Sequence, residues 1–95
     1  MFEITQHNET KNGTFTSRAT DGREAGHITY TWAGADKFII DHTDVNPDFN
    51  GQGVGKQLVL AAVDYARQNG LKIMPLCPFA KSVFDKNADL GEVRF

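Results

Sequence analysis

The stretch "NGQGVGKQL", from Asn50 to Leu58, has glycine at three alternate positions, followed by a lysine and the start of an apolar run. Glycine tolerates positive φ angles and lets the backbone come close to a ligand. Successive N–H groups can then form a concave anion site, which the positive end of a following helix dipole reinforces. The stretch therefore predicts a phosphate-binding loop that leads into a helix.

Two common nucleotide-binding motifs do not fit this loop. A P-loop needs glycine six residues before the lysine and Ser or Thr directly after it, but Asn50 and Gln57 occupy those positions. The dinucleotide pattern G-x-G-x-x-G fails in both possible registers, because its third glycine falls on a residue that is not glycine. Lys56 lies in the first turn of the expected helix, where a cation is unfavourable unless an anion binds nearby.

The chain before the loop is typical of strands. β-Branched and aromatic residues alternate with polar ones in three segments, and a fourth has a continuous apolar centre that predicts burial on both faces. The turn-forming pairs Asn12-Gly13 and Asp21-Gly22 predict hairpin turns between the first three segments. The expected strands are 2–8, 13–20, 25–33 and 36–45.

The chain after the loop changes to helical periodicity. Apolar residues recur at three- and four-residue spacing from Val54 to Ala66, and Asn69-Gly70 predicts the end of the helix. Residues 71–78 form an expected strand interrupted by Pro75, residues 79–86 a short helix, and the polar tail from residue 87 a loose end. This order predicts an α/β (α+β) domain with a mixed, mainly antiparallel sheet.

Length, charge and cysteine content disfavour several classes of protein. The 95 residues predict a single domain spanning 1–95, and a net charge of −2 with scattered basic residues disfavours nucleic-acid binding. We expect neither a signal peptide nor a membrane span, and no cluster of metal ligands is evident in the sequence. Cys77 is the single cysteine, which excludes an internal disulfide and predicts a cytoplasmic location.

The loop and its surroundings resemble the GNAT superfamily of N-acetyltransferases. Residues 50–55 resemble the coenzyme A-binding motif Q/R-x-x-G-x-G/A, with Asn50 in place of the first Gln or Arg. The resemblance is strongest to the small, stand-alone YjdJ-like N-acetyltransferases. They share His42-Thr43 with Val45 before the loop, and "MPLCP" with Cys77 and "FDKN" after it. The resemblance implies a GNAT-like fold whose central parallel strand pair splays apart.

The resemblance also implies acetyl-CoA as cofactor. The pantetheine arm is expected in the opening between the splayed strands, against the backbone near Asp44 and Val45. The pyrophosphate is expected on the glycine loop, with further contacts from the last helix. The implied cofactor-binding residues are Asp44, Val45, Asn50, Gly51, Gln52, Gly53, Val54, Gly55, Lys56, Phe79 and Lys81.

Acetyl transfer to an amine requires removal of the amine proton, stabilisation of an oxyanion and departure of the thiolate. The implied catalytic residues are His42 and Cys77. His42 is a candidate general base, directly or through a water. Cys77 could protonate the leaving thiolate or first accept the acetyl group as a nucleophile. The nearby acids Asp41, Asp44 and Asp48 are further candidates for attracting an amine or supplying the base.

The sequence does not identify the amine that accepts the acetyl group. Residues 9–25 lack a helical stripe, whereas larger members of the resembled superfamily have helices after their first strand that shape the acceptor site. An open groove would suit a protein or peptide amine, or a small polyamine; alternatively, a second subunit completes it. We therefore expect a monomer or weak homodimer that transfers acetyl groups directly in a ternary complex. The rival hypothesis is a non-catalytic acyl-CoA-binding sensor or partner module.

Overall fold

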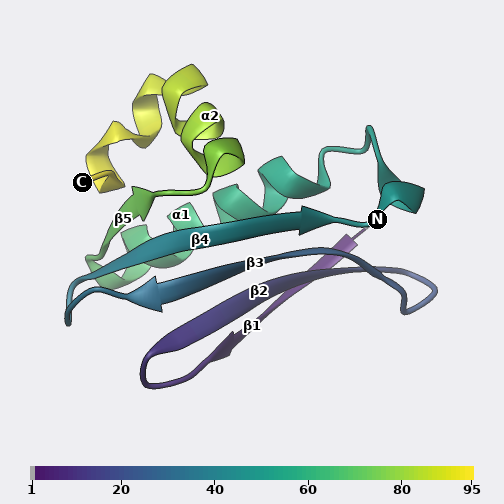
Figure 1. Cartoon of the computed structure of the whole chain (residues 1–95), viewed down its shortest axis with the longest axis horizontal. Coiled ribbons are helices and arrows are strands. Elements are labelled where there is room, and N and C mark those ends of the chain that lie inside the picture. Colours follow the sequence, from purple (N-terminus) through teal and green to yellow (C-terminus); the bar gives the residue numbers. More distant parts are fainter. Residues whose placement is uncertain (1) are drawn as a thin grey trace.

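A computed structural model describes residues 2–95 and contains one five-stranded sheet (Figure 1). The strand order follows the sequence: the first four strands pair antiparallel, and the last two pair parallel. The predicted mixed, mainly antiparallel sheet is thus confirmed. The strands are β1 (Phe2–Asn8), β2 (Asn12–Ala19), β3 (Glu24–Trp32), β4 (Lys37–Val45) and β5 (Lys72–Pro75).

Two α-helices follow the glycine loop. Helix α1 (Val54–Asn69) is the crossover that a parallel pair requires, and it lies behind the sheet in Figure 1. It ends as predicted at Gly70, whose φ of 66° is left-handed. Helix α2 (Pro78–Lys86) follows β5. Two short 3₁₀ helices, η1 (Pro47–Phe49) and η2 (Ala88–Val93), precede the loop and end the chain.

The hydrophobic core lies on one face of the sheet. Phe38 and Ile40 of β4 and Ile73 of β5 are fully buried in a cluster that includes both helices. Their neighbours on the opposite face are more exposed: Ile39 is half-buried and Met74 is 39% exposed. The prediction that β4 is buried on both faces is therefore wrong, because within residues 2–95 no helix covers the second face.

Both predicted hairpins form, but only one turn falls on the predicted residue pair. Gly22 has a φ of 90° between β2 and β3, as Asp21-Gly22 predicts. Asn12-Gly13 instead belongs to β2, and the preceding turn is closed by a hydrogen bond from Glu9 N to Asn12 O. Gly13 is required for packing rather than turning, since the ring of Tyr30 occupies the space that a Cβ atom would need.

The C-terminal tail is ordered, so the predicted loose end is wrong. Leu90 and Val93 of η2 are buried in the core, and the Phe95 amide donates to the Ile73 carbonyl at 3.0 Å. Arg67 of α1 also forms an ion pair with Glu92. The tail is polar on average, but its two buried apolar residues cover the end of the core next to β5.

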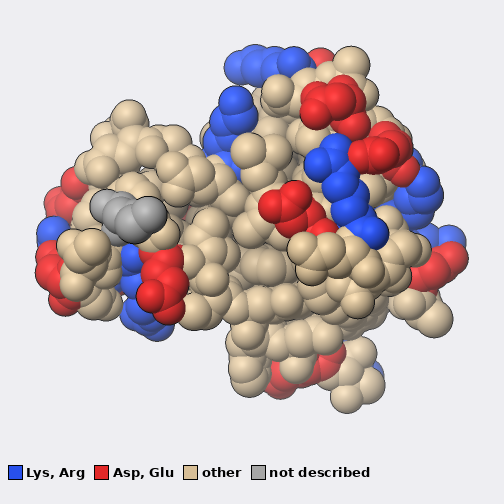
Figure 2. Space-filling model, turned by 180° about the vertical axis from the view of Figure 1, so that it is seen from behind, with Lys and Arg blue, Asp and Glu red and all other residues tan. Residues whose placement is uncertain are grey.

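Charges of both signs are interspersed on the face seen from behind the sheet (Figure 2). That face shows no broad basic region of the kind that binds nucleic acid. In the part of the chain that the structure describes, no helix is long and apolar enough to cross a bilayer.

Candidate functional site

The glycine loop leaves the first turn of α1 open to an anion. Gly51 and Gly53 have φ angles of 79° and 74°, and Gly53 is the N-cap, which has no side chain to cap the helix. The first intrahelical bond runs from Gln57 N to Gly53 O at 3.0 Å. The N–H groups of residues 54–56 therefore lack an intrahelical acceptor, as the first amides of any helix do. Together with the helix dipole they favour a phosphate.

The third glycine of the motif has a different role from the first two. Gly55 is helical and buried, and its φ is not positive. A Cβ atom there would lie 2.7 Å from Cζ of Phe79 in α2. Gly55 therefore does not use the positive φ that glycine permits; it is needed for close packing of the two helices. Phe79 is 41% exposed beside the loop.

The parallel strands are paired along only part of their length. Their pairing runs from Lys37 opposite Lys72 to Ile40 opposite Pro75. One further hydrogen bond joins Cys77 N to Ile40 O at 3.1 Å, while β4 continues to Val45. The edge of β4 from residue 41 to 45 is thus unpaired on the side of β5, whose strand ends at proline. Backbone groups of Asp44 and Val45 lie along this opening.

A bulge in β4 decides which side chains face the open side of the sheet. Thr29 pairs with His42 and Tyr30 with Ile40, so Asp41 is the extra residue. His42 shares the face of Thr29, opposite the core, and is exposed. Asp41, which accepts a hydrogen bond from the Thr31 hydroxyl at 2.6 Å, and Asp44 are exposed near it.

Cys77 lies on the other side of β4 from His42. Its thiol donates to the Thr43 hydroxyl at 3.4 Å, and Thr43 pairs with the core residue Ile28. The structure thus brings Cys77 to the opening but does not pair it with His42. The two candidates instead flank the strand edge on which the pantetheine arm is expected.

The surroundings of Cys77 favour its thiolate. Burial raises the pKa of the thiol, but hydrogen bonding with the Thr43 side chain lowers it, as do the backbone N–H groups of Ala80 and Phe79. The lowering contributions prevail, so the pKa of Cys77 lies below its ordinary value. Cys77 is the N-cap of α2, a position where the helix dipole also favours a negative charge.

The remaining predicted cofactor-binding residues differ in exposure. Asn50, Gln52 and Lys56 are exposed, and Lys56 has no ion pair within residues 2–95. Lys81 is engaged by Asp85 at 3.0 Å. Val54 is buried beneath the loop.

Two site residues were missed from the sequence. Thr43 was given no role, although it is the hydrogen-bond partner of Cys77. Gly26 of β3 would place a Cβ atom 2.7 Å from the Asp44 carbonyl and 3.0 Å from Cγ1 of Val54. It therefore allows the end of β4 and the start of α1 to pack together. Neither role has a local sequence signal, because both depend on strand pairing.

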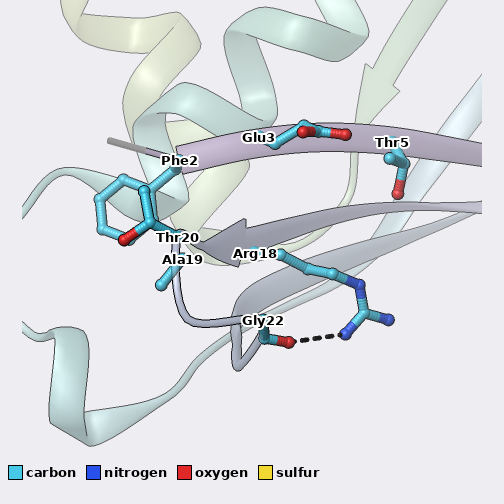
Figure 3. Close-up of a pocket in the computed structure, with 7 residues that line it drawn as sticks. All are labelled: Phe2, Glu3, Thr5, Arg18, Ala19, Thr20 and Gly22. Carbon is cyan, nitrogen blue, oxygen red and sulfur yellow. Dashed lines mark hydrogen bonds between the residues drawn. The ribbon is translucent and has the colours of Figure 1, made fainter.

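A surface hollow lies away from this site, at the paired ends of β1 and β2 (Figure 3). None of its lining residues belongs to the glycine loop or to the opening between β4 and β5. The lining residues are Phe2, Glu3, Thr5, Arg18, Ala19, Thr20 and Gly22.

A glycine loop at a helix N-terminus, placed between two parallel strands that are unpaired beyond Ile40, is the arrangement that the resemblance to coenzyme A-dependent acyltransferases implies. The chain belongs to the GCN5-related N-acetyltransferase family, whose sequence model matches residues 14–93. It is therefore an N-acetyltransferase that uses acetyl-CoA, and the predicted family, fold and cofactor are confirmed.

Similar proteins agree with this assignment. A GCN5-like protein from Staphylococcus aureus, solved by NMR, is 35% identical with a TM-score of 0.74, covering 98% of this chain and 87% of that one. Protein NATD1 of Xenopus tropicalis is 25% identical over 84 residues, which are 88% of this chain and 77% of that protein. The fold also resembles a Bacillus anthracis streptothricin acetyltransferase candidate crystallised with acetyl coenzyme A. That similarity has a TM-score of 0.58 at 19% identity and covers 70% of this chain and 38% of that one.

Proposed function

We propose that this single-domain enzyme transfers an acetyl group from acetyl-CoA directly to an amine of a protein, peptide or small molecule. The observation that carries the proposal is the unpaired edge of β4, with Cys77 on one side and His42 on the other. A thioester bound along this edge would be reached by an amine from the open face of the sheet. The leaving sulfur would then lie on the side of Cys77.

In this reaction the amine nitrogen attacks the thioester carbonyl carbon, and the carbon–sulfur bond breaks. His42, exposed on the open face, would accept the amine proton, directly or through a water. Cys77 would donate its proton to the leaving coenzyme A thiolate. Its lowered pKa favours this donation, and the Thr43 hydroxyl would stabilise the cysteine thiolate that results.

Cofactor binding is assigned to the loop and the strand edge. The free N–H groups of residues 54–56 would bind the pyrophosphate, and the backbone of Asp44 and Val45 would bind the pantetheine arm. Phe79 and Lys81 would line the cofactor from α2. We further propose that the enzyme works in the cytoplasm as a monomer or weak homodimer.

The test is release of free coenzyme A by the purified protein with acetyl-CoA and a panel of peptide and small-molecule amines. We expect Cys77→Ala and His42→Ala to lower kcat while the Kd for acetyl-CoA stays nearly unchanged. Intact-mass analysis without acceptor distinguishes the chemical routes, since an acetylated Cys77 would indicate a nucleophile rather than an acid. Binding without turnover across the panel would contradict the proposal and favour the sensor hypothesis.

A further inference from the structure

The short helix η1, directly before the glycine loop, is contacted by a side chain from another part of the sheet. The guanidinium carbon of Arg23, at the turn before β3, lies 4.8 Å from the centroid of the Phe49 ring. Arg23 also forms an ion pair with Asp48 at 3.5 Å. Phe49 is 7% exposed and is joined to Asn50, the first residue of the motif, by one peptide bond.

Arg23 is itself fixed in place. Its backbone N–H donates to Asp21 Oδ1 at 3.0 Å, and its Nε donates to Asp21 Oδ2 at 2.8 Å. These hydrogen bonds, the backbone one first, lower the pKa of Asp21, so the carboxylate stays charged. The rings of Phe49 and Phe2 also pack edge to face, with centroids 5.7 Å apart. Phe49 is thus fixed by the N-terminal strand and the β2–β3 turn together.

The backbone next to Arg23 is bonded to the start of η1. Asn46 N donates to the Ala25 carbonyl at 2.8 Å, and the Asn46 side-chain amide donates to the Glu24 carbonyl at 3.1 Å. Asn46 in turn caps η1 by accepting from Asp48 N at 3.0 Å. Residues 23–25 therefore hold both ends of the segment 46–49.

The glycine loop needs such external support. Among the residues that the structure describes, a Cβ atom on Gly51 would meet nothing within 4 Å, and one on Gly53 would meet only the far end of the Gln57 side chain. Glycine loses more conformational freedom on ordering than any other residue. A loop that is already ordered binds its ligand without that entropic cost.

We propose that Arg23 is a positioning residue for acetyl-CoA binding. By stacking on Phe49 and pairing with Asp48, it holds the loop from Asn50 to Gly53 in its anion-binding conformation. It acts through Phe49 and does not itself need to touch the cofactor. The proposal rests on the assignment of the glycine loop as the pyrophosphate site.

The experiment compares Arg23→Ala, Arg23→Met and Arg23→Lys in the full chain. Its readouts are the Kd of coenzyme A by calorimetry and amide hydrogen exchange of Gly51 and Gly53 by NMR. Arg23→Ala should raise the Kd about five- to tenfold, as expected for loss of one cation–π contact and a surface ion pair. It should also speed exchange of both glycines before any cofactor is added. Arg23→Lys, which keeps the charge, should raise the Kd and speed the glycine exchange less than Arg23→Ala does. Arg23→Met should give changes between those of the lysine and alanine variants.

Arg18→Ala is the matched control. Arg18 belongs to the same hairpin, and among residues 2–95 its side chain donates a hydrogen bond only to the Gly22 carbonyl, at 3.5 Å (Figure 3). Its removal should leave the Kd and the exchange of both glycines unchanged.

Two results would overturn the proposal. One is a lower Tm for Arg23→Ala with unchanged Kd and unchanged glycine exchange, which would mean a structural role alone. The other is an equal change in Arg18→Ala, which would mean a general effect of charge. The exchange measurement needs no cofactor, so it separates this proposal from the cofactor site. If coenzyme A failed to shift the Gly51 and Gly53 signals of the unaltered protein, the site assignment would fail, and with it the proposed role in binding.

Discussion

The ring of Phe79 occupies the space that a Cβ atom on Gly55 would need, with Cζ 2.7 Å and Cε2 2.8 Å from that position. This contact joins the first turn of α1 to the first turn of α2. The two helices are thereby fixed to each other on either side of the opening between β4 and β5. The amides of the glycine loop and the thiol of Cys77, the N-cap of α2, are held at a set separation as a result.

Gly55→Ala should destabilise the protein by about 1–3 kcal/mol, the usual cost of overpacking a filled site. The added methyl group has to displace an aromatic ring, which outweighs the gain in helix propensity. In a Phe79→Ala background the ring is absent, and the same change should become neutral or stabilising by up to about 1 kcal/mol. Chemical denaturation of the four proteins measures this coupling.

Gly91→Ala is the control for that cycle, because a Cβ atom there would meet no atom of the described chain within 4 Å. It should change the stability by less than about 0.5 kcal/mol. If Gly55→Ala cost the same with and without the Phe79 ring, helix contact would not be the reason for glycine at this position.

The thiol of Cys77 should titrate below its ordinary pKa, and Thr43→Val should raise the midpoint. The valine keeps the shape of threonine but removes the hydroxyl that is bonded to the sulfur. The rate of alkylation by iodoacetamide, followed by intact mass across a pH series, measures both midpoints. Thr31→Val, which removes a hydroxyl bonded to Asp41, is the control and should leave the midpoint unchanged.

The same pKa shift predicts a pH-dependent stability. Because the folded pKa lies below the unfolded one, deprotonation of Cys77 adds stability as the pH rises from the folded pKa towards the ordinary value of 9.0. This contribution is complete above 9.0 and is lost as the pH falls through the folded pKa. It should be absent from Cys77→Ala. An identical pH dependence of unfolding in both proteins would contradict a perturbed thiol.

Leu90→Ala should cost about 2–4 kcal/mol, because Leu90 is 2% exposed and its truncation leaves a cavity in the core. Leu76→Ala is the matched control: Leu76 is 60% exposed, and its truncation should change the free energy of unfolding by less than about 0.5 kcal/mol. Equal, small losses in the two variants would mean that η2 is not part of the folded core.

The sequence predicted those elements that local pattern determines. Helical spacing with a terminal glycine predicted α1, alternation predicted the first three strands, and a continuous apolar centre predicted the fourth. What it missed depends on contacts between distant segments. Gly13 was interpreted as a turn residue because the Tyr30 ring above it belongs to another strand. The role of Gly55 was missed for a similar reason, since its partner Phe79 comes from the next helix.

The sequence proposes the residues of the candidate site but not their arrangement. The spacing of the motif predicts an anion site, because the backbone that such a site requires lies within six residues. The placement of His42 and Cys77 on opposite sides of β4 depends on the bulge at Asp41. One residue more or less in that strand exchanges its two faces, and no local pattern indicates the extra residue.

Ser17→Ala should leave the stability unchanged or raise it by up to about 1 kcal/mol. Ser17 is fully buried on β2, and within residues 2–95 its hydroxyl has no hydrogen-bond partner. An unpaired hydroxyl in an apolar environment costs free energy that alanine avoids. Thermal and chemical denaturation measure the change. Thr16→Ala, the neighbouring strand residue that is only half-buried, should lose a little stability instead, because its β-branched side chain favours a strand. A loss of more than about 1 kcal/mol in Ser17→Ala would mean that a bound water satisfies the hydroxyl.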